Sequence, residues 1–206
     1  MLVISYILTT NMVKDSAWKR YCIGDIIYSP FSLESGVFFI ESGYVTASTI
    51  DDGGKKRIHL IYGPGTYFPL LSLHRGTPQR ATYEALTDDV HISIMKQTDF
   101  NVRLDTEIRF CRDVLSKTVD QLALFADRVI DLQMTKLTEK LLCKLKVLAS
   151  DHGVLADEYT QLPYKLRHHH LADMLGVERE SVSRSLSSLK RDGLISIKDG
   201  YILVCR

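Results

Sequence analysis

Four polar side chains of types that can read nucleic-acid bases lie within a six-residue stretch near the C-terminus. They are Arg179, Glu180, Ser183 and Arg184. An arginine can donate two hydrogen bonds to guanine, and a carboxylate can accept one from the N4 amino group of cytosine. We therefore expect these residues to read base edges in a major groove of double-stranded DNA. The alternative is that Arg179 and Arg184 only solvate the face of a helix.

Two short helices with a tight turn between them would position these side chains. Apolar residues recur at helical spacing before and after a glycine. These residues are Leu171, Ala172, Leu175, Val182, Leu186 and Leu189. We expect Gly176 to supply the positive φ that ends the first helix, and the small Ala172 to let the second helix approach closely. The pattern predicts a helix-turn-helix whose second helix carries the base-reading residues.

Two strands, at 193–197 and 201–204, follow these helices and are joined by a Lys-Asp-Gly turn, which predicts a winged helix. The residues best suited to contact phosphates are Lys165, Arg167, Ser181, Lys190 and Lys198. His168, His169 and His170 point about 100° apart on a helix, so they cannot all bind one metal ion. Arg167 stands where Ser, Thr or Asp would cap that helix, and the sequence offers no reason for it.

Charge is distributed unevenly along the 206 residues, whose net charge is only +1. The segment from Tyr164 onward has eight basic and five acidic residues, and the remainder has 18 basic and 20 acidic residues. Nucleic-acid binding is therefore expected to be local to the basic C-terminal segment. The four cysteines are far apart, and neither a leader segment nor a membrane span is evident. A cytoplasmic location with no membrane partner is the default expectation.

The N-terminal half reads as short strands separated by turns. Residues 1 to about 20 are ambiguous, with a short helix over 14–20 as one interpretation, and strands are expected at 22–28, 37–40, 44–50, 57–62, 82–86 and 90–95. The run Asp51-Asp52-Gly53-Gly54 is a strong hairpin signal. Many short strands at nearly regular spacing predict a small antiparallel sandwich or barrel.

From about Asp105 to Leu132 the period becomes helical, with two interleaved heptad rows. The rows contain Ile108, Leu115, Leu122 and Val129, and Cys111, Thr118, Phe125 and Leu132. Such rows predict a coiled-coil seam between two parallel copies of the chain. The alternative is a helix packed on its own domain. A further amphipathic helix is expected over 138–149, followed by a loop to Pro163.

This order of elements resembles the CRP/FNR superfamily of bacterial transcription regulators. LADMLGVERESVSRSLSSLKRDGLI is similar to the family's DNA-binding signature, and FFIESGYVTAS, IYGPGTYF and RATYEALTDD resemble its sensor landmarks. The resemblance implies an α+β fold with an antiparallel β-roll sensor over 1–104, a dimerisation helix over 105–135 and a winged helix-turn-helix over 136–206. It also implies a homodimer on a pseudo-palindrome, with RNA polymerase as a partner. The trio Glu180, Ser183 and Arg184 resembles readers of TTGA half-sites, and Arg179 resembles an arginine of TGTGA readers.

The sensor departs from the cyclic-AMP-binding pattern of that family. Leu70 stands where a glutamate binds the ribose, and Gln79-Arg80 replaces the Arg-Ser pair that grips the phosphate. We therefore expect no tight cyclic-nucleotide binding. The tentative effector pocket comprises Phe68, Leu70, Leu71, Leu73, Arg75 and Arg80. It would suit a small apolar molecule with an acid group, and the alternative is a sealed core without a ligand.

Other cofactors of the family fit poorly. Cys22 is the only cysteine near the start of the sequence, which excludes the family's N-terminal iron–sulfur cluster. His59, His74 and His91 show no pairing that singles out a haem ligand, and haem stays an alternative. The sequence contains no nucleophile–base constellation, metal motif or phosphate loop, so no enzyme is expected. The remaining alternative is a cytoplasmic small-ligand sensor whose winged helix binds protein.

Overall fold

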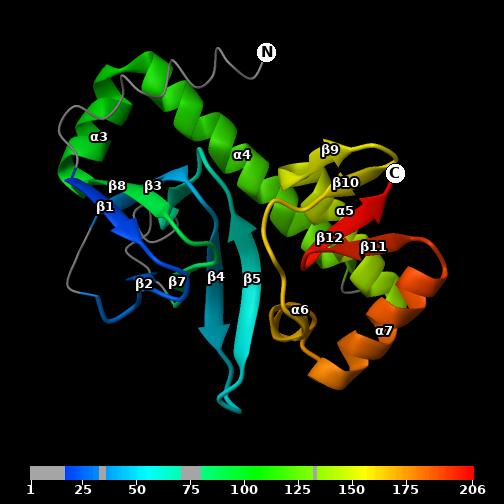
Figure 1. The fold of residues 1–206 in the computed structure, drawn as a ribbon. Coiled ribbons are helices and arrows are strands. Elements are labelled where there is room, and N and C mark those ends of the chain that lie inside the picture. Colours follow the sequence, from blue (N-terminus) through cyan, green and yellow to red (C-terminus); the bar gives the residue numbers. More distant parts are fainter. Residues whose placement is uncertain (1–16, 33–35, 71–79, 132–133) are drawn as a thin grey trace. The chain divides into compact units, whose positions relative to one another are not determined.

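The computed structural model describes residues 17–32, 36–70, 80–131 and 134–206, and Figure 1 shows its elements. The chain divides into two compact units. The first contains residues 1–47 and 61–123, and the second contains residues 48–60 and 124–206. The tip of one hairpin, residues 48–60, is therefore grouped with the C-terminal part of the chain.

Two four-stranded sheets form the N-terminal β-structure, with strand orders β1-β8-β3-β6 and β2-β7-β4-β5. The strands of the first sheet are β1 (Ala17–Tyr21), β8 (Val90–Met95), β3 (Val37–Ser42) and β6 (Tyr67–Phe68). Those of the second are β2 (Ile26–Tyr28), β7 (Thr82–Ala85), β4 (Val45–Ile50) and β5 (Lys56–Tyr62). The antiparallel pairing and the short strands agree with the sandwich predicted from the turn spacing.

The interpretation of 14–20 as a short helix is wrong for its described part, because residues 17–21 form strand β1. This strand pairs with β8 from Ala17 opposite Ile94 to Tyr21 opposite Val90. An isolated helix of seven residues is unstable in water, whereas the ladder with β8 satisfies the backbone of the whole segment. Residues 14–16 lie outside the described part of the chain.

Strand β3 is buried on both faces, because alternate side chains enter two different clusters. On one face, the rings of Phe38 and Phe68 stack with centroids 5.4 Å apart, and Phe68 stacks on Tyr83 at 4.5 Å. On the other face, Val37 and Phe39 join a second cluster. Its remaining buried members are Tyr67, Phe100, Phe110 and Val114. The period-two alternation of a strand therefore determines which residues reach the helices.

Two helices cover that second cluster: α3 (Gln97–Thr106) and α4 (Ile108–Asp131). Helical structure starts at Gln97, earlier than the expected Asp105. The additional helix α3 precedes the heptad rows, and Phe100 is its one buried residue. Helix α4 buries Phe110 and Val114 against the sheet. One predicted heptad row lies exposed on α4. Its members are Ile108, Leu115, Leu122 and Val129, whose exposed fractions are 60–66%.

The second unit contains the C-terminal helices and a four-stranded sheet of order β11-β12-β10-β9. The helices are α5 (Leu137–His152), α6 (His168–Leu175) and α7 (Arg179–Arg191). The strands are β9 (Val154–Ala156), β10 (Tyr159–Gln161), β11 (Ile195–Lys198) and β12 (Tyr201–Cys205). The loop expected from Asp151 to Pro163 is instead largely a hairpin, because β10 pairs with β12. No helix among the described residues is long and apolar enough to cross a membrane.

Candidate nucleic-acid interface

Helix α7 has one buried face and one exposed face. Val182, Ser185, Leu186 and Leu189 are buried. At about 100° per residue, these four project to one side of the helix. Its opposite side is formed by Glu180, Ser183, Arg184, Ser187 and Arg191, of which all except the partly buried Ser183 are exposed. Predicted base readers therefore lie on the face that packing leaves free.

Three of the four predicted base readers, Arg179, Glu180 and Arg184, are exposed in the first two turns of α7. Nη2 of Arg184 lies 3.3 Å from Oγ of Ser181 and donates to it. This bond holds the guanidinium close to the helix start, beside a hydroxyl predicted to contact a phosphate. The structure thus brings the base-reading group together, and the roles of its members stay predictions.

The turn before α7 has the geometry expected for Gly176. This residue adopts φ 71° and ψ 32°, the left-handed conformation that favours glycine. Its N–H donates to the carbonyl of Ala172 at 2.8 Å, and the N–H of Val177 donates to the same carbonyl at 3.1 Å. Ala172 itself is buried. The two helices are therefore joined as the sequence predicts.

The start of α6 has a side-chain bond back to its cap position, Arg167. The backbone N–H of Arg167 donates to Nδ1 of His170 at 3.3 Å, the contact that the third helical residue makes in a capping box. Burial lowers the pKa of His170 to about 4, with smaller contributions from His169, Lys56 and Arg167. A neutral ring is required here because a protonated Nδ1 cannot accept a hydrogen bond. Among the described residues, no group of His, Cys, Asp and Glu could hold a metal ion.

Two of the five predicted phosphate-binding residues lie at the wing, Lys198 within it and Lys165 against it. Lys198 is the exposed last residue of β11. The ammonium of Lys165 lies 5.0 Å from the ring centroid of Tyr201. A side chain at Gly200 would come within 3.3 Å of Lys165, so the lysine lies against the wing turn. Lys190 is separate from these residues, because it lies in the last turn of α7, about 16 Å along the axis from Arg179.

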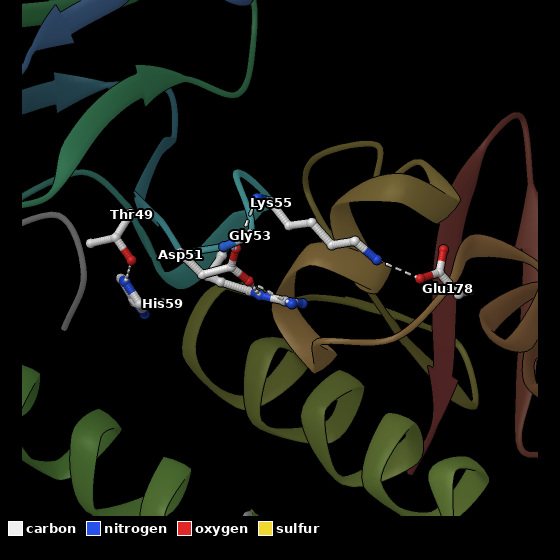
Figure 2. A network of polar contacts seen from close by, with 7 residues as sticks. Thr49, Asp51, Gly53, Lys55, His59 and Glu178 are labelled. Atoms are coloured by element: carbon white, nitrogen blue, oxygen red, sulfur yellow. Dashed lines mark hydrogen bonds and ion pairs between the residues drawn. The ribbon is translucent and has the colours of Figure 1, made fainter.

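Sequence reasoning missed an ion pair between the hairpin tip and the start of α7, which Figure 2 shows. Nζ of Lys55 lies 2.6 Å from Oε1 of Glu178, the residue that precedes α7. Beside it, the carboxylate of Asp51 is 2.8 Å from Nε of Arg57. The partners Lys55 and Glu178 are 123 positions apart in the sequence. No local signal could have joined them.

The tentative effector pocket is not assembled by the described residues. Phe68 lies in the ring stack with Phe38 and Tyr83. Leu70 packs instead against the cluster beneath α3 and α4, and Arg80 is exposed. Leu71, Leu73 and Arg75 lie outside the described residues, so the pocket stays a prediction.

Helix α4 forms hydrogen bonds with strand β6, which precedes the segment of the predicted pocket. The hydroxyl of Tyr67 donates to Oδ2 of Asp113 at 3.1 Å, and Nε2 of Gln121 donates to the carbonyl of Tyr67 at 3.0 Å. Burial, followed by the neighbouring Asp113 carboxylate, raises the pKa of Tyr67, which keeps its hydroxyl protonated. Nζ of Lys117 lies close to Gly65, 3.2 Å from the place of an added Cβ.

Two family models match this chain. A cyclic nucleotide-binding domain matches residues 18–107, and a Crp-like helix-turn-helix domain matches residues 140–206. The cyclic AMP receptor protein of Thermus thermophilus is 25% identical over 190 residues, which cover 90% of this chain and 82% of that protein. The transcriptional activator protein FnrL of Cereibacter sphaeroides is 26% identical over 189 residues, or 88% and 73% of the two chains.

Solved structures show the same fold. A mutant of CooA from Carboxydothermus hydrogenoformans aligns with a TM-score of 0.77 and 23% identity, covering 94% of this chain and 85% of that one. A cyclic nucleotide-binding domain containing protein from Listeria monocytogenes aligns with a TM-score of 0.82 and 15% identity, covering 99% and 98%. The two family models, together with the similar regulators, show that the chain belongs to the CRP/FNR superfamily of DNA-binding transcriptional regulators.

Proposed function

We propose that the chain acts as a homodimer that reads a pseudo-palindromic, TTGA-like site through helix α7. The observation that carries this proposal is the exposed cluster of Arg179, Glu180 and Arg184 on the first two turns of that helix. A carboxylate and an arginine so placed match cytosine N4 and guanine in one half-site. Ser183 favours the TTGA class, because TGTGA readers tend to have glycine there.

The exposed heptad row on α4 supports the homodimer. Ile108, Leu115, Leu122 and Val129 stay 60–66% exposed on a helix whose other side is already packed. An apolar stripe repeating every seven residues is the seam that a second parallel helix covers. The second row is less open at two of its described members, since Cys111 is partly buried and Phe125 is 37% exposed. Thr118 is exposed, and the fourth member, Leu132, lies outside the described residues. Two-fold symmetry would place the two α7 helices about 34 Å apart, one turn of DNA.

We further propose that the controlling signal is not a cyclic nucleotide. Leu70 contributes its side chain to an apolar cluster and cannot accept a hydrogen bond from a ribose. Phe68 is buried in the ring stack rather than left open to a ligand. By its resemblance to the family, the regulator would act in the cytoplasm and contact RNA polymerase. A small-molecule effector remains part of this proposal.

Selection of binding sites from random duplexes, followed by gel shifts with Arg184→Ala, tests the proposed reading. Loss of one arginine–guanine contact should remove about 1–3 kcal/mol of discrimination for each half-site. Lys165→Ala is the matched control, because loss of a phosphate contact should weaken binding to all sequences about equally. Full site selectivity in Arg184→Ala would refute the assignment of α7. A DNA affinity without steep salt dependence would instead favour a winged helix that binds protein.

A further inference from the structure

The tip of the β4–β5 hairpin carries three consecutive cations, Lys55, Lys56 and Arg57, on a rigid turn. One oxygen of Asp51 accepts hydrogen bonds from the backbone N–H groups of Gly53 at 3.0 Å and Lys55 at 2.9 Å. Its other oxygen lies 2.8 Å from Nε and 2.7 Å from Nη2 of Arg57. One carboxylate therefore organises both the turn and the Arg57 guanidinium, and Figure 2 shows Asp51 beside Gly53 and Lys55.

Each of these cations faces a different part of the helix-turn-helix. Lys55 forms the 2.6 Å ion pair with Glu178 before α7. A Cβ on Gly176 would be 3.3 Å from Nη1 of Arg57, so this guanidinium lies against the turn. Lys56 acts on α6, where its charge contributes to the lowered pKa of His170. The tip therefore contacts the helix-turn-helix next to the N-terminal end of α7, where the base-reading residues lie.

A hairpin docked there competes for the space that DNA requires. The major groove is about 12 Å wide, and a helix with its side chains is about 10–12 Å in diameter. A recognition helix therefore fills the groove and leaves no room beside its N-terminal end for two strands about 4.8 Å apart. Arg179 and Arg184 are exposed to water, but a DNA duplex is far larger than a water molecule. The docked hairpin therefore still blocks the approach of DNA to these side chains.

We propose that the β4–β5 hairpin tip is an intramolecular latch: in the DNA-free protein Lys55 binds Glu178 before α7 and Arg57 lies against the turn at Gly176, and the tip must leave before α7 enters the groove. This inference rests on the proposed function of α7. The contact is weak, because the side chains of Lys55 and Glu178 are both largely exposed. Exposed ion pairs contribute little binding free energy. A weak contact suits a switch, because DNA or an effector can readily displace it.

For Lys55→Gln, the latch predicts a change in DNA affinity of the opposite sign to that expected from the loss of a positive charge. Lys55→Gln removes a positive charge, so a role in attracting phosphates predicts weaker DNA binding. Release of a latch predicts tighter binding, by about two- to thirtyfold for two exposed ion pairs in a dimer. Lys96→Gln, which changes an exposed lysine before α3, is the matched control. The charge-reversed pair K55E/E178K restores the contact and should return the affinity towards that of the wild type.

Fluorescence anisotropy on the selected duplex, with full-length protein, measures these affinities. NMR of the backbone amides of Gly176 and Glu178 gives a readout without DNA, and we expect both to shift in Lys55→Gln and not in Lys96→Gln. Unchanged amides, or a Lys55→Gln protein that binds the duplex no more tightly than wild type, would overturn the latch. If neither wild type nor Lys55→Gln binds any selected duplex specifically while the amides do shift, the proposed function of α7 fails and the hairpin contact stands.

Discussion

Replacing Leu122 by alanine should disrupt the proposed dimer far more than it disturbs the fold. Leu122 is 66% exposed in the single chain. Full burial of a leucine side chain contributes about 1.5–3 kcal/mol, so about two thirds of that, roughly 1–2 kcal/mol, remains to be gained when a partner covers it. Both chains of a two-fold dimer carry the substitution, so the lost free energy of association is doubled. The dimer should therefore lose about 2–4 kcal/mol, which raises its Kd by about 30- to 900-fold.

Sedimentation velocity over nanomolar to 100 micromolar protein measures this shift directly. Val102→Ala is the matched control, because Val102 is also exposed, at 60%, but lies on α3 outside the heptad rows. Both variants should unfold within about 0.5 kcal/mol of wild type when measured as monomers, since neither residue is packed in the chain. Equal dimer constants for the two variants, or a wild type that is monomeric at micromolar concentration, would refute the seam on α4.

Two further predictions concern protonation and ligand. Burial lowers the pKa of His152 to about 4 from its ordinary 6.5, so between these values the unfolded chain binds more protons than the folded one. The free energy of unfolding should then fall as pH drops below about 6.5, by about 1.4 kcal/mol per pH unit from this group. Urea unfolding at pH 7.5 and 5 should show a smaller fall in His152→Gln, and an equal fall would contradict this assignment. Cyclic AMP at millimolar concentration should leave the Tm unchanged, whereas a rise of several degrees would show that the Leu70 substitution does not prevent binding.

Sequence patterns predicted the elements whose signals are local. Gly176 between two apolar periodic segments predicted the helix-turn-helix, and the structure gives this residue the expected positive φ. The Asp-Gly run at 51–54 predicted the β4–β5 hairpin, and seven-residue spacing predicted α4. In each case the residues that determine the conformation are neighbours in the sequence, so propensity and periodicity were sufficient.

Elements that depend on distant partners were missed. Residues 17–20 read as helical because their pairing with β8, more than 70 positions away, leaves no local trace. The β9–β10 hairpin was read as a loop for the same reason, since β10 pairs with β12 and the turn uses Asp157 at φ 52° rather than a glycine. For the site, the base-reading group on α7 followed from spacing. The pair Lys55–Glu178 did not, because only the fold brings it together.

Helix α4 joins the predicted sensor segment to the proposed dimer seam through its two opposite faces. Asp113, Lys117 and Gln121 follow one another at four-residue spacing. Asp113 and Gln121 form hydrogen bonds with the hydroxyl and the carbonyl of Tyr67, and Lys117 lies beside Gly65. Leu122, adjacent to Gln121, belongs to the exposed row on the other side. A ligand that displaced Tyr67 would break its bonds to Asp113 and Gln121 together and free α4 to shift. Because packed interfaces have few discrete arrangements, such a shift would select between dimer geometries rather than bend one continuously.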